Sequence, residues 1–303
     1  MADTVTSDET RDAPQARPVP RTKNVLPAWL GLLPFFLFAF AFLVAPAGFL
    51  VTGSLQDDAG AFTLKNFQNL ARPDIINAYR NSIEVSAITA VGGGLFGFLL
   101  AYAAILGGLP RFVRSALVTF SGVASNFAGV PLAFAFIATL GQVGLLTGLL
   151  KNLFNLTIYD SGFSLYTKLG LSLTYMYFQF PLMVLIMAPA LEGLKREWRE
   201  ASENLGASTA QYWRYVALPI LLPSLLGTMI LLFGNAFGAH ATAFALTGGT
   251  INLVTILIGA QIRGDVLHDP GLGYALAMGM VVIMAASIAV YSWLQRRTER
   301  WLR

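Results

Sequence analysis

Six stretches of this chain contain no charged residue, and each is longer than the roughly 20 residues that an α-helix needs to cross the hydrocarbon core of a membrane. They cover residues 24–56, 85–110, 115–150, 169–191, 215–262 and 270–295. Their apolar residues are continuous, without the alternation that is typical of barrel strands. Charged residues make up 12% of the chain, about half the usual share of a soluble protein. The sequence therefore predicts an all-α integral membrane protein with six transmembrane helices.

Two of these stretches are too long for a single helix. In the first, we expect a transmembrane helix from about Ala116 to Leu140, followed by a short helix that lies at the membrane surface. In the second, we expect a transmembrane helix from about Leu218 to Leu246. The apolar segment 251–262 that follows has only about 12 residues, which is short for a span and suits an interfacial or buried segment.

The basic residues predict the orientation. With six spans and the N-terminus inside, 14 of the 20 Lys and Arg residues lie on the cytoplasmic side and 6 lie outside. The positive-inside rule favours this arrangement, with both termini in the cytoplasm. Residues 1–24 are polar and contain three prolines, so we expect a disordered cytoplasmic tail ahead of a membrane domain at 25–303.

One strongly polar passage, from Arg196 to Leu221, interrupts the second half of the chain. An apolar stripe at helical spacing is expected on one face, from Leu191, Leu194, Trp198, Ala201 and Leu205. Charged pairs four residues apart should support the other face; they are Glu192 with Arg196, Arg196 with Glu200, and Arg199 with Glu203.

A glycine and a serine then predict how this passage bends. Gly206 is expected to end the helix, and Ser208 with Gln211 is expected to form a capping box that opens a second helix. Residues 191–219 thus predict a helix–glycine–helix elbow on the cytoplasmic side. The residues alone leave two roles open for the apolar stripe of this elbow. The stripe packs either on the chain's own spans or in a groove of a partner protein.

The elbow resembles the EAA loop of importer-type ABC transporter permeases. That pattern is Glu-Ala-Ala, three residues, Gly, nine residues, then Ile-x-Leu-Pro. The matching positions here are Glu200, Ala201, Ser202, Gly206, Val216, Leu218 and Pro219. All spacings match, with Ser for the second Ala and Val for Ile. The resemblance covers roughly residues 80–300 and is to the methionine-importer-like permease fold, in the bacterial inner membrane.

The resemblance implies a division of labour. The permease itself binds no cofactor, and ATP and Mg are held by separate ABC ATPase subunits, in whose cleft the elbow docks. Glu200 then lies near the ATPase surface, and Leu194 and Trp198 belong to the docking elbow. A second permease completes the path, with a heterodimer favoured, and an extracytoplasmic binding protein delivers the substrate. None of the five lysines follows a glycine, so the chain lacks the Gly-Lys-Ser/Thr of a Walker A loop.

Polar residues inside the predicted spans are the candidates for lining a path; they are Asn126, Gln179, Asn235 and His240. Neutral polar side chains in spans often join helices instead, which stays open for each of them. Gly93 and Gly97 stand in the G-x-x-x-G relation that allows helices to approach closely. A general resemblance to spermidine and putrescine permeases implies a polyamine substrate.

Two other classes of function fit the sequence less well than an importer permease. An ion-coupled carrier or channel acting alone usually keeps ionisable relays in its spans, and His240 is the one candidate near mid-span here. A membrane enzyme is disfavoured, since the chain has two histidines, no cysteine and no clustered intramembrane carboxylates. No catalytic residue, metal site or nucleic-acid surface is expected.

Overall fold

The computed structural model describes residues 25–57, 59–263 and 268–299, so the predicted tail at 1–24 lies outside the described residues. In this part of the chain every regular element is a helix, and an isolated antiparallel bridge joins Gln56 and Phe62. Among the described residues, six helices are long and apolar enough to cross a membrane, which confirms the predicted fold class. They are Leu30–Ser54, Pro73–Leu106, Gly129–Phe154, Lys168–Glu192, Thr209–Phe237 and Pro270–Arg296.

The chain divides into two compact units, Met1–Phe49 and Leu50–Arg303. The first contains α1 (Val25–Ala39), a π-helical turn at Phe40–Val44, and the start of α2 (Ala45–Ser54). These three segments form a continuous helical run. Its apolar residues follow one another without a break, which is why the sequence predicts the first span here correctly.

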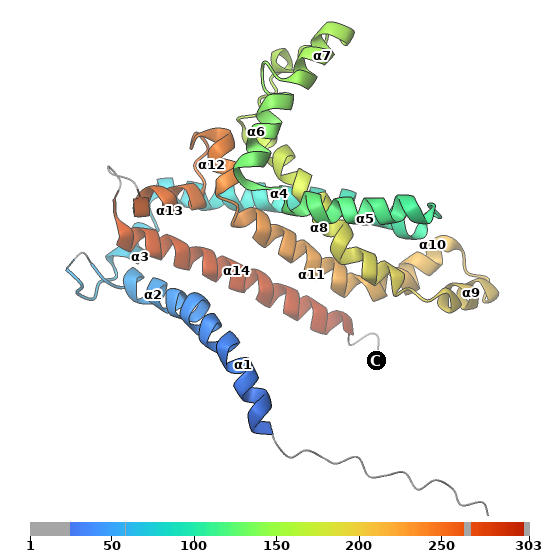
Figure 1. The fold of residues 1–303 in the computed structure, drawn as a ribbon, viewed down its shortest axis with the longest axis horizontal. Coiled ribbons are helices and arrows are strands. Elements are labelled where there is room, and N and C mark those ends of the chain that lie inside the picture. The colour runs from blue at the N-terminus through green and yellow to red at the C-terminus, as the bar shows by residue number, and fades with distance from the viewer. Residues whose placement is uncertain (1–24, 58, 264–267, 300–303) are drawn as a thin grey trace, which may run out of the picture. The chain divides into compact units, whose positions relative to one another are not determined.

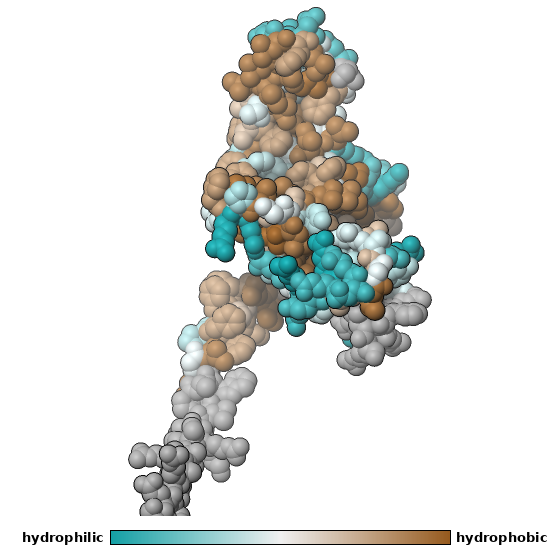
Figure 2. All heavy atoms as spheres, turned by 90° about the vertical axis from the view of Figure 1, so that its right-hand side faces the viewer, coloured by the Kyte–Doolittle hydropathy of each residue, from teal (hydrophilic) through white to brown (hydrophobic). Residues whose placement is uncertain are grey.

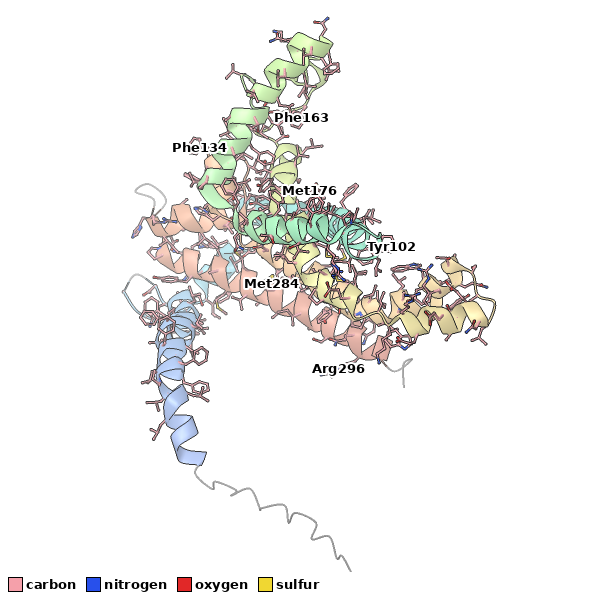
Figure 3. The ribbon with its side chains drawn as sticks, turned by 45° about the vertical axis from the view of Figure 1, so that its right-hand side comes forward. Tyr102, Phe134, Phe163, Met176, Met284 and Arg296 are labelled. Carbon is pink, nitrogen blue, oxygen red and sulfur yellow. The ribbon has the colours of Figure 1, made fainter. Side chains whose placement is uncertain are left out.

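The second unit contains the remaining helices: α3 (Lys65–Asn69), α4 (Pro73–Leu106), α5 (Arg111–Asn126), α6 (Gly129–Leu140), α7 (Leu145–Phe154), α8 (Lys168–Glu192), α9 (Arg196–Asn204), α10 (Thr209–Tyr212), α11 (Leu218–Phe237), α12 (Ala241–Thr247), α13 (Val254–Arg263) and α14 (Pro270–Glu299). Helices α4, α8, α11 and α14 run beside one another as a bundle, and α5 packs along α8 (Figure 1). Helices α6 and α7 rise away from the bundle, and Figure 3 shows Phe134 on α6.

Glycines bring α4 and α8 close together. A Cβ atom added at Gly93 would lie 2.5 Å from Cβ of Gln179, and one added at Gly97 would lie 2.6 Å from Cβ of Met183. Because neither distance leaves room for a side chain, the two backbones approach as only small residues allow. The predicted G-x-x-x-G packing pair is therefore confirmed. Around it, Met183, Met187 and Leu191 are fully buried.

Two ion pairs join α8 to its neighbours near its two ends. Lys168 at the start of α8 lies 2.8 Å from the carboxylate of Glu84 on α4, and Glu192 at its end pairs with Arg114 on α5. Glu192 was expected to pair with Arg196 along one helix. That prediction is wrong because α8 ends at Glu192 and Gly193 follows, so Arg196 belongs to a different helix.

The predicted third span at 116–140 is also wrong in its bounds. Helix α5 ends at Asn126, and α6 begins at Gly129, whose φ of +75° is a left-handed conformation that favours glycine. Pro131 lacks the N–H that would bond to the carbonyl of Phe127, which disfavours a continuous helix at this point. The candidate span is Gly129–Phe154, which includes the segment predicted at the membrane surface.

The fifth span ends earlier than predicted. Helix α11 ends at Phe237, and Gly238 caps it, with its N–H directed to the carbonyl of Gly234. A separate short helix, α12, starts at Ala241. The following segment forms α13, Val254–Arg263, a helix too short to be counted as a span, as predicted for residues 251–262. Val254 is fully buried, so α13 is packed into the unit.

Candidate functional site

The predicted elbow is present, and hydrogen bonds close its bend. Helix α9 is followed by Gly206 with a φ of +76°. The N–H of Gly206 donates to the carbonyl of Glu203 at 2.9 Å, and the N–H of Ala207 donates to the carbonyl of Ser202 at 3.0 Å. This pair of bonds is a Schellman motif, in which a left-handed residue satisfies the last carbonyls of a helix. The prediction that Gly206 ends the helix is confirmed.

The second arm begins with the predicted capping box. The N–H of Gln211 donates to Oγ of Ser208 at 3.3 Å, and the N–H of Ser208 donates to Oε1 of Gln211 at 2.7 Å. Helix α10 then passes into α11 through a π-helical turn at Trp213–Ala217, where the N–H of Leu218 donates to the carbonyl of Trp213. The two arms of the elbow are thus connected directly to α8 and α11.

The elbow is anchored to the bundle through its second arm. The ring of Trp213 packs edge-on against Tyr102 of α4, with ring centroids 5.2 Å apart. Figure 3 labels Tyr102 at the end of the bundle that faces α9 and α10. Tyr212 is also buried. The first arm, α9, packs mainly against α10 and projects from this end of the molecule (Figure 1).

The residues of the EAA pattern lie on different faces of the elbow. The side chain of Glu200 is 56% exposed and pairs with Arg196 at 2.9 Å, and Glu203 pairs with Arg199 at the same distance. Ala201 and Leu218 are exposed, and Val216 and Pro219 are half-buried. Ser202 is buried, with its hydroxyl donating to the carbonyl of Arg199. Hydrophilic residues gather at this end, which faces the viewer in Figure 2.

The predicted apolar stripe is only partly a single surface. Leu191 is fully buried on α8, and Leu194 is half-buried in the link between α8 and α9. Trp198 is exposed, with the Lys195 ammonium 5.7 Å from its ring centroid, and Leu205 is 88% exposed. The stripe was predicted as one helix, and this is wrong because Gly193 ends α8. Trp198, Ala201 and Leu205 remain exposed on the projecting arm, which is α9 and the residue that follows it.

A substitution at Gly206 should loosen this bend. A Cβ at Gly206 would meet nothing within 4 Å, so the cost comes from the backbone alone. A left-handed conformation costs an ordinary residue roughly 1–2 kcal/mol, which corresponds to a factor of about 5–30 in an equilibrium. We expect Gly206→Val to speed amide hydrogen exchange of residues 200–212 by that factor. Gly206→Asn should stay near wild type, because Asn tolerates this conformation. If these amides were equally protected from exchange in the Val variant and in the wild type, Gly206 would not be needed for the bend.

A cavity of about 540 Å³ lies where two helix breaks meet, one between α5 and α6 and the other between α11 and α12. It is lined from α5 and α6 by Ser125 and Gly129, from α8 by Phe178, and from α11 and α12 by Asn235 and Thr242, among others. The junctions of α5 with α6 and of α11 with α12 lie at the end of the bundle opposite α9 and α10 (Figure 1). The cavity therefore lies at the junction of three helical segments that are far apart in the sequence.

Hydrogen bonds hold the two breaks in place. The N–H of Gly129 donates to Oγ1 of Thr242 at 2.7 Å, which ties the start of α6 to the start of α12. The hydroxyl of Tyr175 on α8 donates to the carbonyl of Ala239 at 2.8 Å. Both bonds satisfy backbone groups that the interrupted helices leave without partners. Sequence reasoning did not identify Thr242 and Gly129 as a pair.

Two of the four predicted path residues line this cavity. Asn235 and His240 both contribute to its wall. His240 was expected near the middle of a helix, and this is wrong because it lies at the start of α12, next to the break. Asn126 is exposed at the end of α5, where its amide donates to the carbonyl of Gly122.

Gln179 has a different environment. It is fully buried on α8, where its amide donates to the carbonyl of Leu232 on α11 at 2.9 Å. Its Oε1 atom is buried without a hydrogen-bond partner among the described residues. The placement does not support a path-lining role for Gln179, because its side chain joins helices α4, α8 and α11. Its placement favours the alternative, in which a polar residue connects spans.

Comparisons with known proteins identify relatives along most of the chain. Residues 93–303 match the family model described as "Binding-protein-dependent transport system inner membrane component". A probable sulfate transport system permease protein, cysT, of Nephroselmis olivacea is 24% identical over 291 residues, covering 95% of this chain and 96% of that protein. The spermidine/putrescine transport system permease protein PotB of Haemophilus influenzae is 26% identical over 279 residues, covering 89% and 91%.

A solved structure shares the fold. It belongs to a bacterial alginate ABC transporter in complex with a periplasmic protein bound to an alginate pentasaccharide. A chain of that complex aligns with 14% sequence identity and a TM-score of 0.70, over 89% of this chain and 94% of the other. At this identity the likeness concerns the arrangement of helices.

Proposed function

Because this chain belongs to the binding-protein-dependent transport system inner membrane component family, we propose that it forms half of the transmembrane path of an ATP-driven importer and couples that path to a separate ATPase subunit. Family membership makes the chain a multi-pass permease subunit, and its relatives are transport permeases. No observation on the described residues favours the alternative of an ion-coupled carrier or channel acting alone.

One observation carries the coupling proposal. The elbow continues at one end into α8 and at the other, through the π-helical turn, into α11. The same two helices line the cavity at the opposite end of the bundle, with Phe178 from α8 and Gly234 and Asn235 from α11. A force applied to the elbow would therefore act on two helices that shape the cavity. The projecting arm with Glu200, Ala201 and Trp198 would make the contact with the ATPase.

The proposal includes the partners that such a chain requires. ATP and Mg would be bound by ABC ATPase subunits, and this chain would hold no cofactor. A second permease, in a heterodimer, would complete the path, and an extracytoplasmic binding protein would deliver the solute. The alginate transporter complex with its periplasmic protein supports the last of these partners by its shared fold. The chain would lie in a bacterial inner membrane with both termini in the cytoplasm, from its distribution of Lys and Arg.

The solute would be small and polar. Relatives named for sulfate and for spermidine and putrescine are about equally similar to this chain, at 24% and 26% identity. The resemblance described for the sequence favours a polyamine, and the sulfate permeases favour an oxyanion. These classes differ in the sign of their charge, so the electrostatics of the path can distinguish them.

Reconstitution tests the proposal. We expect vesicles that contain this chain, its partner permease and the ATPase to take up solute only with internal ATP and an added binding protein. Omitting the ATPase, or replacing ATP by a non-hydrolysable analogue, should abolish uptake. ATP hydrolysis should rise when the loaded binding protein is added. Uptake by this chain without any ATPase would contradict the proposal and favour a carrier.

A further inference from the structure

A second cavity, of about 450 Å³, is also lined by His240. It is lined by His240, Phe244, Ile256, Gly259, Ala260 and Arg263. His240 therefore contributes to the walls of both cavities. Its ring stacks on Phe244 with an interplanar angle of 14°, and a Cβ added at Gly259 would lie 3.1 Å from its Cε1 atom. The imidazole is thus held between α12 and α13 as a partition between the two spaces.

Each polar side chain that lines the two cavities is able to donate a hydrogen bond. Arg263, at the end of α13, offers an exposed guanidinium to the second cavity, and Asn235 and Thr242 offer an amide and a hydroxyl to the first. Nδ1 of His240 is buried without a partner among the described residues. Within that part of the chain, no carboxylate lines either cavity. Among the described residues, the charged side chain that lines them is that of Arg263, which is positive.

We propose that the two cavities form successive parts of a path for a small inorganic oxyanion, with Arg263 at the entrance and His240 at the partition. This assignment rests on the proposed function. A polyamine has only cationic donors, so it needs carboxylates, and Arg263 would repel it. An oxyanion needs N–H and O–H donors, and a guanidinium suits its geometry. A positive charge at the mouth of a low-dielectric cleft also raises the local concentration of anions.

The absence of cysteine from the native chain allows a direct test of this electrostatic field. We would place a cysteine by Asn235→Cys in the complete transporter and measure its rates of modification, on this chain, by two methanethiosulfonate reagents of similar size. One reagent carries a sulfonate and the other a trimethylammonium group. The rate for the sulfonate reagent divided by the rate for the trimethylammonium reagent should fall about tenfold when Arg263→Glu is added, because the charge at the entrance is reversed.

A matched control is available on α4. Arg80 is an exposed arginine of the same unit that lines neither cavity, so Arg80→Glu changes the net charge equally and should leave the ratio nearly unchanged. Arg263→Lys should keep most of the preference for the anionic reagent. An unchanged ratio in the Arg263→Glu variant, an equal change with Arg80→Glu, or failure of both reagents to reach the cysteine overturns the path.

Uptake of two probes by the reconstituted transporter tests the oxyanion assignment and the proposed function separately. We expect ATP-dependent uptake of sulfate but not of spermidine, with sulfate uptake about tenfold lower in Arg263→Glu. Spermidine uptake, or uptake of neither probe while the binding protein still stimulates ATP hydrolysis, overturns the oxyanion assignment and leaves the proposed function. Uptake that needs no ATPase overturns the proposed function instead.

Discussion

Gly97→Val is expected to prevent normal assembly of the membrane bundle. A Cβ at Gly97 would lie 2.6 Å from Cβ of Met183 and 2.9 Å from the backbone carbonyl oxygen of Phe180. These atoms belong to the stem and backbone of α8, so a rotamer change cannot move them away. Helices α4 and α8 must separate, and such overpacking typically costs about 1–3 kcal/mol. We expect a lower melting temperature in detergent and a loss of monodisperse protein.

The effect of Gly97→Val can be separated from that of adding valine to any helix. Gly122 lies within α5, and a Cβ there would meet nothing within 4 Å. Gly122→Val should therefore leave the melting temperature unchanged or raise it slightly, since glycine is the poorer helix former. Gly93→Val should resemble Gly97→Val, because its Cβ would lie 2.5 Å from Cβ of Gln179. Equal stability of the Gly97 and Gly122 variants would refute close packing of α4 on α8.

The positions of most spans could be predicted because charged residues flank the apolar runs. Helix α8 illustrates this, since the predicted run of 169–191 differs by one residue at each end from the helix Lys168–Glu192. The interruptions could not be predicted from composition. Helix α8 contains Pro181 and Pro189 and remains continuous, whereas Pro131 helps to separate α5 from α6. Whether a proline ends a helix depends on packing against other segments.

The elbow could be predicted from the sequence, whereas the cavity could not. The Schellman motif at Gly206 and the capping box at Ser208 involve residues at most five positions apart, so their sequence pattern determines them. The cavity depends on contacts such as that of Gly129 with Thr242, which are 113 residues apart. A single sequence contains no record of such a contact. The sequence pattern does not indicate that Arg263 lines a cavity for the same reason.

Glu200→Arg is expected to uncouple the transporter while Glu203→Arg does not. The two glutamates are matched, because each pairs with an arginine four residues earlier at 2.9 Å and their side chains are 56% and 55% exposed. Each exposed pair contributes only about 0.3–0.5 kcal/mol to the helix, so the local cost should be small and equal. A charge reversal against a basic, partly buried partner surface would cost on the order of 1–3 kcal/mol more, at Glu200 alone.

The measurements are the apparent affinity of the ATPase for the permease and the ATP-driven uptake in vesicles. For Glu200→Arg we expect both to fall about 5- to 150-fold, the range that corresponds to 1–3 kcal/mol. The amount of inserted protein should be normal, since the residue lies on the projecting arm. Equal losses in both variants would indicate that the helix itself, and not a contact at Glu200, transmits the force. Full uptake in both would exclude a charge contact of α9 with the ATPase at Glu200, and the apolar residues of the elbow, such as Tyr215, which is 66% exposed, would then be the next to test.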